Sequence, residues 1–288
     1  SSMSTAQHRS TRRSFAALVA SIAVALGAAS SGATAAGIEE TFKRHAPVSK
    51  VTVDHAPFDM ILKTYVVPGK DGLNRVAYAR LKAKGQAALR AYIRSLGKVD
   101  VTKLARKEQF AFWANLYNAR TLDIVVEKYP VASIKDINLG GSLLTIVTGG
   151  PWKAKVVKVN GLALSLDDIE HVILRGLFKD PRVHYAVNCA SVGCPNLLTE
   201  AFTGAKLEAQ LDAGARAYVN HPRGIKVVGG KVVASSIYKW FIKDFGGTEA
   251  GVLAHVRKYA APQLADRLKG KSSVSEYAYD WSLNDAKL

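Results

Sequence analysis

Between Glu108 and Tyr129 the sequence has the pattern of one long helix with apolar side chains around most of its circumference. These side chains are Phe110, Phe112, Trp113, Leu116, Tyr117, Leu122, Ile124, Val125 and Val126. A helix that is apolar on all sides has to be covered by other elements, so the pattern predicts a central and largely buried helix. The rest of the chain must therefore pack around this segment.

Two amides, Asn115 and Asn118, interrupt this apolar helix and project from one of its faces. A buried amide without a partner is costly, so both side chains need hydrogen bonds. Two interpretations stay open. The pair is either a structural clamp on a neighbouring loop or a device that orients a substrate or a catalytic group.

The remaining segments predict helices in larger number than strands, and the strands come mostly in hairpins. Hairpins are expected for 65–67 with 76–78, for 155–159 with 162–164 across Asn160-Gly161, and for 225–228 with 231–234. Further helices are expected at 58–62, 86–96, 206–219, 237–245, 249–259 and 262–269, with a strand at 183–187 and a terminal strand containing Tyr277–Trp281. We therefore predict an α+β fold, a helix-rich single domain around a small, mostly antiparallel sheet.

The N-terminus has the order of an export signal. Arg12-Arg13 precede an apolar run from Ala16 to Ala29, and small residues follow up to Ala36. The paired arginines favour a twin-arginine signal, and an ordinary Sec signal is the alternative. We expect residues 1–36 to be a signal peptide, residues 37–288 to form one domain, and the mature protein, without a membrane span, to be periplasmic or secreted.

The chain is strongly basic, with a formal net charge of +17 that falls to +14 when the three arginines of the signal are removed. A basic field favours encounters with polyanions, such as an acidic component of the cell envelope. However, lysine and arginine are spread along the chain without the dense runs that mark nucleic-acid sites. A solvated basic surface is therefore the main interpretation, and no nucleic-acid partner is expected.

The stretch from Asp180 to Pro195 holds both cysteines, Cys189 and Cys194. In a strand over 183–187 the side chains alternate, which places His184 and Asn188 on the face away from the core. Before it, Ser165 and the acids that follow begin a helix that carries Glu170-His171. Glu170 falls on the margin of the apolar stripe of that helix, so it is either paired in a salt bridge or has an acid, base or ligand role.

Several blocks together resemble the family called domain of unknown function 547, and the chain is similar to an exported bacterial member of it. The blocks are 109–119, 150–152, 164–171, 180–195, 235–241, 244–246 and 279–284, so the resemblance covers about residues 95–285. The resemblance implies shared structure and little chemistry. It directs attention to its polar residues: Asn115, Asn118, Glu170, His171, His184, Asn188, Cys189, Cys194, Lys239, Trp240, Asp244 and Asp280.

Three interpretations of the cysteines stay open. In an exported protein two cysteines separated by four residues commonly form a disulfide. Alternatively, one thiol is a nucleophile, with His184 or His171 and Glu170 as base and orienting group and Asn115 or Asn118 as oxyanion donor. The third interpretation is a metal site of Glu170, His171, His184 and a cysteine, with zinc as the metal, although no recognised ligand spacing is present.

The candidate catalytic residues are therefore Cys189, Cys194, His184, His171, Glu170, Asn115 and Asn118. They indicate a thiol-dependent hydrolase or acyl transferase for amide or peptide-like envelope substrates, with no cofactor expected beyond the zinc alternative. The competing hypothesis is a non-catalytic periplasmic binding module with a structural disulfide and a basic face for an acidic partner.

Overall fold

The structure, a computed structural model, describes residues 32–140 and 149–288. The expected export signal lies almost entirely outside this range, so it stays a prediction. Most of the glycine-bracketed segment 140–151 also falls outside it.

Helices account for most of the regular structure in the described part of the chain. They are α1 (Ala35–Phe42), α2 (Ala56–Tyr65), α3 (Tyr78–Lys84), α4 (Gln86–Leu96), α5 (Arg106–Lys128), α7 (Val183–Ala186), α8 (Leu207–Val219), α9 (Ser236–Trp240), α10 (Glu249–Arg257) and α11 (Pro262–Arg267). The shorter or wider helices are the 3-10 helices η1 (Val101–Lys103), η2 (Ile134–Asp136) and η4 (Ile242–Phe245), and the π-helix η3 (Asp168–Phe178).

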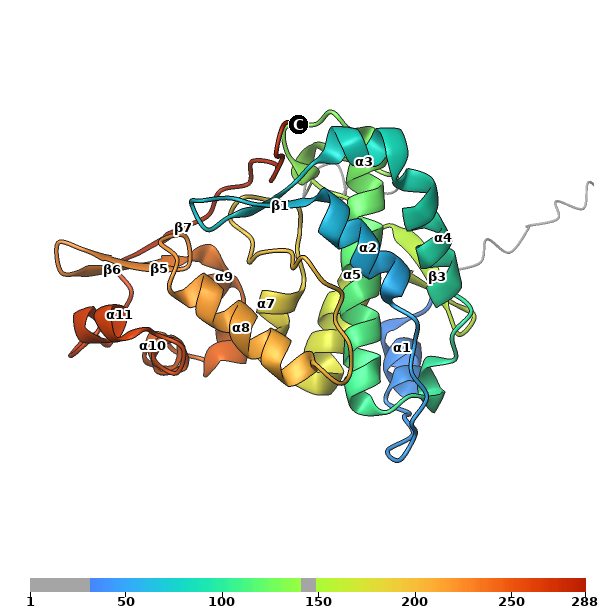
Figure 1. The fold of residues 1–288 in the computed structure, drawn as a ribbon. Helices are drawn as coiled ribbons and strands as arrows, with labels where there is room; N and C mark the ends of the chain where they lie inside the picture. The colour runs from blue at the N-terminus through green and yellow to red at the C-terminus, as the bar shows by residue number, and fades with distance from the viewer. Residues whose placement is uncertain (1–31, 141–148) are drawn as a thin grey trace, which may run out of the picture. The chain divides into compact units, whose positions relative to one another are not determined.

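Helix α5 is the centre of the larger hydrophobic core, as its apolar circumference predicts. All but a few of its side chains are buried, and it packs against α3, α4 and η3. Figure 1 shows α5 between α4 on one side and α7 and α8 on the other. The central helix therefore connects the early part of the chain with the segment that carries the cysteines.

The strands form three small sheets. The hairpins β1 (Val66–Pro68) with β2 (Asn74–Val76), β3 (Lys155–Val159) with β4 (Leu162–Ser165), and β5 (Ile225–Val228) with β6 (Lys231–Ser235) are all antiparallel. Asn160 and Gly161 both have positive φ in the turn between β3 and β4, which is the conformation that an Asn-Gly hairpin turn requires. The three predicted hairpins are confirmed.

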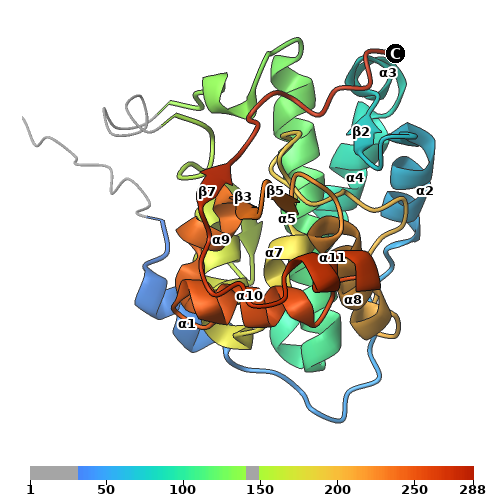
Figure 2. The ribbon, with the colours of Figure 1, turned by 90° about the vertical axis from the view of Figure 1, so that its left-hand side faces the viewer.

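A second hydrophobic core lies under the C-terminal elements. Side chains of α8, β5, β6, α9 and α10 build it, with Tyr185, Tyr218 and Tyr238 among its largest buried members. Figure 2 views this part from its outer side, with α10 and α11 in the foreground. Helix-rich structure around small, mostly antiparallel sheets confirms the predicted α+β class.

The predicted strand at 183–187 is wrong, because this segment is the short helix α7. Asp180 accepts a hydrogen bond from the backbone N–H of Arg182, and Pro181 follows it directly. An aspartate before a proline favours the start of a helix, and here it outweighs the strand propensity of the two valines. The alternation that placed His184 on an outer face does not exist, and His184 is buried with 3% of its surface exposed.

The terminal strand is shorter than expected. It is β7 (Glu276–Ala278), it pairs in parallel with β6, and Tyr279–Trp281 lie beyond its end. Beyond it, the backbone of residues 280–284 runs along the cysteine loop, with a bridge between Ser191 and Leu283. The end of the chain is therefore part of the surroundings of the cysteines.

Candidate functional site

A cavity of about 300 Å³ gathers five of the seven predicted catalytic residues. Its wall contains Glu170 and His171 from η3, His184 from α7, and Cys189 and Cys194 from the loop after α7. The rest of the wall is mostly aromatic: Tyr117, Trp152, Trp240, Phe241, Tyr279 and Trp281 line it together with Asp167, Val187, Pro195 and Ile237.

The two cysteines form a disulfide that closes the loop between them. Cys189 is partly exposed, whereas Cys194 is buried with 4% of its surface exposed. Of the three interpretations drawn from the sequence, the first is therefore realised. A free thiol at either position requires that this bridge is first reduced.

The cysteine loop, residues 189–194, is held by more than its disulfide. Asn188 donates from Nδ2 to the carbonyl of Pro195 at 2.8 Å, which closes the loop a second time. Within the loop, the N–H of Val192 donates to Ser282 and that of Gly193 to Asp280, both at 2.8 Å. Since these contacts are independent of sulfur, we expect the loop to keep its course when the bridge is reduced.

The hydroxyl of Tyr279 lies at the centre of the sulfur site. It is 3.1 Å from Cys189 Sγ, 3.0 Å from Cys194 Sγ and 2.7 Å from the hydroxyl of Ser191. Burial raises the pKa of Tyr279, so this hydroxyl keeps its proton and can donate. Sequence analysis placed Tyr279 in a strand and gave it no role.

His184 is paired with Asp244, a residue that the family resemblance had marked without a role. Nε2 of His184 lies 2.7 Å from Oδ2 of Asp244, and Arg175 contacts the same carboxylate through Nε at 2.6 Å. Burial opposes the charge on Asp244, but the hydrogen bonds from His184 and Arg175 outweigh it and the pKa of Asp244 is lowered. Phe241 stacks on the His184 ring at a centroid distance of 4.3 Å, which fixes its plane.

His171 lies on η3 and has three charged side chains as neighbours. Its Nε2 lies 3.5 Å from Oδ1 of Asp167, its Nδ1 lies 3.6 Å from Oε2 of Glu170, and Arg175 Nη1 approaches Nδ1 at 3.0 Å. Burial disfavours the protonated ring and Arg175 opposes it too, but the two carboxylates outweigh them and the pKa of His171 is raised. The cavity therefore contains a titratable ring between two acids.

The π-helix η3 explains how Glu170 and His171 both reach the cavity. Its first turn is fixed by a reciprocal cap, in which the N–H of Ser165 donates to Asp168 at 2.8 Å and the N–H of Asp168 donates to Ser165 Oγ at 3.0 Å. The wider turn of a π-helix changes the angular spacing of side chains, and such turns are frequent at functional sites. The sequence predicted a helix here, but the π geometry leaves no signal in an apolar periodicity.

Asn115 and Asn118 do not line this cavity. Asn115 donates to the carbonyl of Phe202 at 2.8 Å and accepts from its N–H at 3.0 Å. In the same way, Asn118 donates to Ala186 at 2.9 Å and accepts from the N–H of Asn188 at 2.8 Å. Both amides are engaged with backbone groups of neighbouring segments, which is the arrangement of a structural clamp.

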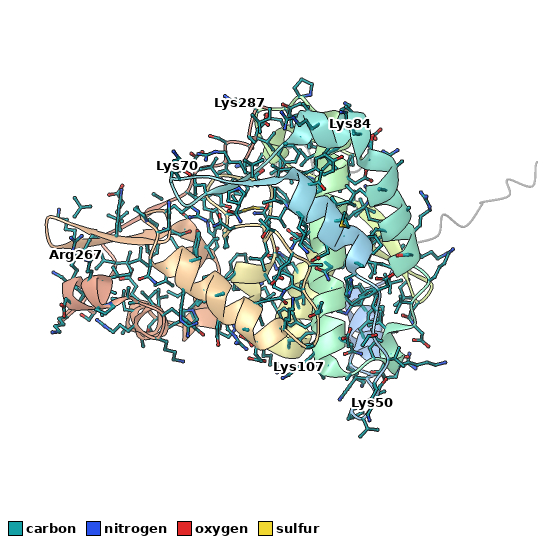
Figure 3. All side chains as sticks on the ribbon, in the orientation of Figure 1. Lys50, Lys70, Lys84, Lys107, Arg267 and Lys287 are labelled. Carbon is teal, nitrogen blue, oxygen red and sulfur yellow. A yellow bond between two sulfur atoms is a disulfide. The ribbon has the colours of Figure 1, made fainter. Side chains whose placement is uncertain are left out.

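The described residues contain no group of three or more His, Cys, Asp or Glu side chains in an arrangement that could hold a metal ion. Nor does the part of the chain that the structure describes contain a helix long and apolar enough to cross a membrane. Basic side chains project at separate places, for example Lys50, Lys84, Lys107 and Arg267 in Figure 3, which agrees with a dispersed basic surface.

Comparison with curated proteins and with solved structures found no match. A family model does match, over residues 101–219, a range that includes α5, η3 and the cysteine loop but not Asp244 or Tyr279. The match is shorter than the resemblance over 95–285 seen in the sequence blocks. It is to the family described as "Protein of unknown function, DUF547", and the chain is similar to that family over these residues.

Proposed function

We propose that this protein is a thiol-dependent hydrolase or acyl transferase for amide or peptide-like substrates, and that its Cys189–Cys194 disulfide is the resting, inactive state. The observation that carries the proposal is that Cys189 shares one cavity with His184, whose ring is paired with Asp244 at 2.7 Å. A sulfur nucleophile, an imidazole and a carboxylate that orients it are the three groups of a thiol acyl-transfer site.

Activation requires a dithiol reductant. One thiolate of the reductant attacks the disulfide and forms a mixed disulfide with one cysteine, while the other cysteine leaves as a thiol. The second thiol of the reductant then attacks the reductant's own sulfur in the mixed disulfide and releases the remaining cysteine. The reductant leaves as a disulfide, and Cys189 and Cys194 become thiols. We assign the nucleophile to Cys189 because it is partly exposed, whereas Cys194 is buried.

The acyl transfer then follows from the orientation of His184. When Nε2–H donates to Asp244, Nδ1 carries the lone pair that accepts the thiol proton of Cys189. The thiolate attacks the carbonyl carbon, the carbon–nitrogen bond breaks, and His184 returns the proton to the departing amine. Water or an acceptor amine then gives a proton to His184 and attacks the thioester carbonyl carbon, the carbon–sulfur bond breaks, and the thiolate of Cys189 takes up that proton from His184. With water the enzyme is a hydrolase, and with an amine it is a transferase.

Tyr279 and the remaining predicted residues receive roles that match their positions. The hydroxyl of Tyr279, close to Cys189 Sγ, donates to negative charge that develops beside the sulfur. Glu170 and His171 supply polar contacts to the substrate from the opposite element, η3. Asn115 and Asn118 are positioning residues that hold the loops through backbone hydrogen bonds.

We further infer that the protein works in the periplasm or outside the cell. The export pattern of residues 1–36 supports this location, and a disulfide persists in oxidising compartments. Fractionation of cells that express the full chain tests it, because the processed protein is expected outside the cytoplasm and an unprocessed cytoplasmic protein contradicts the inference.

A trapping experiment tests the proposed chemistry with an activated ester, p-nitrophenyl acetate, as probe. After reduction with a dithiol, the wild-type protein is expected to carry an acetyl group on Cys189, located by mass mapping. Cys194→Ser leaves Cys189 free without a reductant, so this variant is expected to be acylated in the absence of a dithiol. Cys189→Ser is expected to lose the modification.

The base is tested by His184→Asn and Asp244→Asn in the Cys194→Ser background. A general base contributes about 10²-fold or more, so His184→Asn is expected to slow acylation by about that factor. His45→Asn is the matched control, because His45 is exposed and lies outside the cavity. Equal acylation of the His184 and His45 variants, or acylation that survives Cys189→Ser, would overturn the proposal.

The second candidate function is a binding module in which the disulfide is structural. The aromatic wall supports it, since Trp240, Tyr279 and Trp281 lie within 5.7 Å of one another by ring centroids. Such a wall binds an apolar or ring-shaped ligand without any thiol chemistry. A disulfide that resists dithiols in the folded protein, together with ligand binding unchanged by cysteine substitution, would favour this function over the enzyme.

A further inference from the structure

A second cavity, of about 380 Å³, also borders the cysteine loop. Tyr279 lines both cavities, and the second is also lined by Val192 and Gly193 of the loop. Its charged wall residues are Arg223, Lys226 and Asp280. The proposed acyl-transfer function makes no use of this cavity.

Arg223 is held in place without a carboxylate. Its Nε donates to the carbonyl of Cys194 at 3.0 Å, its Nη2 donates to Asn196 Oδ1 at 3.0 Å, and its guanidinium lies 5.0 Å from the centroid of the Tyr218 ring. In the described part of the chain no acid lies within salt-bridge distance of it, whereas Arg175 and Arg182 are both paired with acids.

One end of this guanidinium lacks a partner. Nη1 of Arg223 is buried and makes no hydrogen bond within the described residues. A buried donor that is left unpaired destabilises the protein, and the effect is larger when the donor is charged. A preorganised guanidinium with an unpaired donor is the group that proteins use to bind carboxylate and phosphate oxygens.

The remaining wall fits an anion better than a cation. Lys226 adds a second positive charge, and no acid in the described residues pairs with it. Asp280 is the one acid of the wall, and its Oδ1 already accepts from the N–H and the hydroxyl of Ser282, at 2.8 and 2.5 Å. Apolar side chains such as Leu73, Val192 and Val233 complete the cavity.

We propose that the second cavity binds an organic oxyanion, a carboxylate or phosphate group on an apolar body, with Arg223 and Lys226 as its cationic partners. The apolar wall receives the body of the ligand, and the two cations receive its oxygens. Because Arg223 also holds the carbonyl of Cys194, a ligand bound here contacts the framework of the cysteine loop. The proposal is independent of the thiol chemistry and survives if that chemistry fails.

The test is calorimetric titration of the full chain with benzoate and with phenyl phosphate, which separates the two sources of the oxyanion. Benzamide is the neutral control, since it has nearly the shape of benzoate without the charge. We expect at least one of the two anions to bind and benzamide not to bind. Equal binding of benzoate and benzamide would show an apolar cavity without anion recognition and would overturn the proposal, as would no binding of either anion.

Variants then identify the cations. Lys226→Ala is expected to weaken anion binding about fivefold, since an exposed charge pair contributes roughly 1 kcal/mol. Lys226→Glu is expected to weaken it further, and Arg223→Gln to abolish it. Lys231→Ala is the matched control, because Lys231 is an exposed lysine on the same hairpin that does not line the cavity.

Equal losses for the Lys226 and Lys231 variants would mean that the net charge of the protein, and not this cavity, attracts the anion, and the proposal would fall. Arg223→Gln removes the hydrogen bond to Cys194 as well and can impair folding. For this reason the comparison of Lys226→Ala with Lys231→Ala, both at exposed positions, decides the outcome if the Arg223 variant does not fold.

Discussion

The hydroxyl of Tyr279 lies 3.1 Å from Sγ of Cys189, and it is the one phenolic group that touches both sulfur atoms in the described residues. In the reduced protein this hydroxyl is positioned to donate a hydrogen bond to a thiolate. A hydrogen bond to a charged group contributes about 1.5–3 kcal/mol. Tyr279 therefore favours the reactive form of the reduced cysteine.

The first prediction is that Tyr279→Phe lowers the reactivity of Cys189 in the reduced protein. Loss of the donor is expected to decrease the alkylation rate by iodoacetamide at neutral pH by about tenfold, since 1.4 kcal/mol corresponds to a factor of ten. Tyr277→Phe is the control, because the Tyr277 hydroxyl bonds Glu249 and not sulfur. Equal alkylation rates for the two variants would show that the Tyr279 hydroxyl does not increase the reactivity of Cys189.

A second prediction separates the two asparagines of α5. Asn115→Ala and Asn118→Ala each remove two hydrogen bonds to buried backbone, so each is expected to destabilise the fold by about 2–3 kcal/mol in urea unfolding. Only Asn118 holds Ala186 and Asn188, next to the cysteine loop. Asn118→Ala alone is therefore expected to speed reduction of the disulfide by a dithiol.

Equal reduction rates in the two asparagine variants would contradict this division of roles. They would mean that general destabilisation, and not the anchoring of the loop, controls access to the sulfur atoms. Because the two substitutions are chemically identical and lie one turn apart on the same helix, the comparison isolates the loop contact.

Much of the fold was predictable from local sequence patterns. The apolar circumference of α5 indicated a central helix, and the Asn160-Gly161 turn indicated the β3–β4 hairpin, because both signals depend on neighbouring residues. The prediction of a strand at 183–187 was wrong because it, too, relied only on neighbouring residues. Its valines favour a strand locally, while the turn that Asp180 holds through the N–H of Arg182, together with the burial of His184, favours a helix.

The candidate site was predictable only in part. Glu170, His171, His184 and the cysteines were identified from residue types and from the family resemblance, and the structure brings them to one cavity. Asp244 and Tyr279 are 60 and 90 residues away from their partners His184 and Cys189, so no local spacing reveals these contacts. Packing between distant segments brings Asp244 and Tyr279 to the site, and a single sequence contains no local pattern that predicts such packing.

A third prediction concerns Gly193, whose position in the cysteine loop leaves no room for a side chain. A Cβ there would lie 2.9 Å from the Tyr279 ring and 3.0 Å from the backbone nitrogen of Asp280. Gly193→Ala is therefore expected to cost about 1–3 kcal/mol and to displace Tyr279 from the sulfur atoms. Gly214→Ala in α8 is the control, since its Cβ would make ordinary contacts with Tyr185 and alanine favours a helix by about 1 kcal/mol.

Thermal unfolding of both glycine variants tests whether the fold requires glycine at position 193. A lower melting temperature for Gly193→Ala beside an unchanged or higher one for Gly214→Ala is expected. If Gly193→Ala melts like the wild-type protein, the close contact between the cysteine loop and the C-terminal segment is not a constraint on the fold.

The last prediction is a loss of stability between pH 6.5 and pH 4. Burial lowers the pKa of His55 and of His255 to about 4. In the unfolded chain both rings take up a proton near pH 6.5, so within this window the unfolded state binds more protons and gains stability as the pH falls. Each ring is expected to contribute up to about 3 kcal/mol of destabilisation at pH 4.

Urea unfolding across this range measures the effect. His255→Gln is expected to flatten the dependence on pH, because it removes one of the two rings whose pKa is lowered to about 4. Glutamine keeps an acceptor near the Tyr185 hydroxyl, which His255 Nε2 contacts at 2.8 Å. The exposed His45 provides the control variant His45→Gln, which is expected to keep the wild-type slope. His171 does not enter this window, since its raised pKa makes its contribution full below pH 6.5 and lost as the pH rises above that value. A slope that His255→Gln leaves unchanged would show that carboxylates, and not the buried histidines, set the acid limit of the fold.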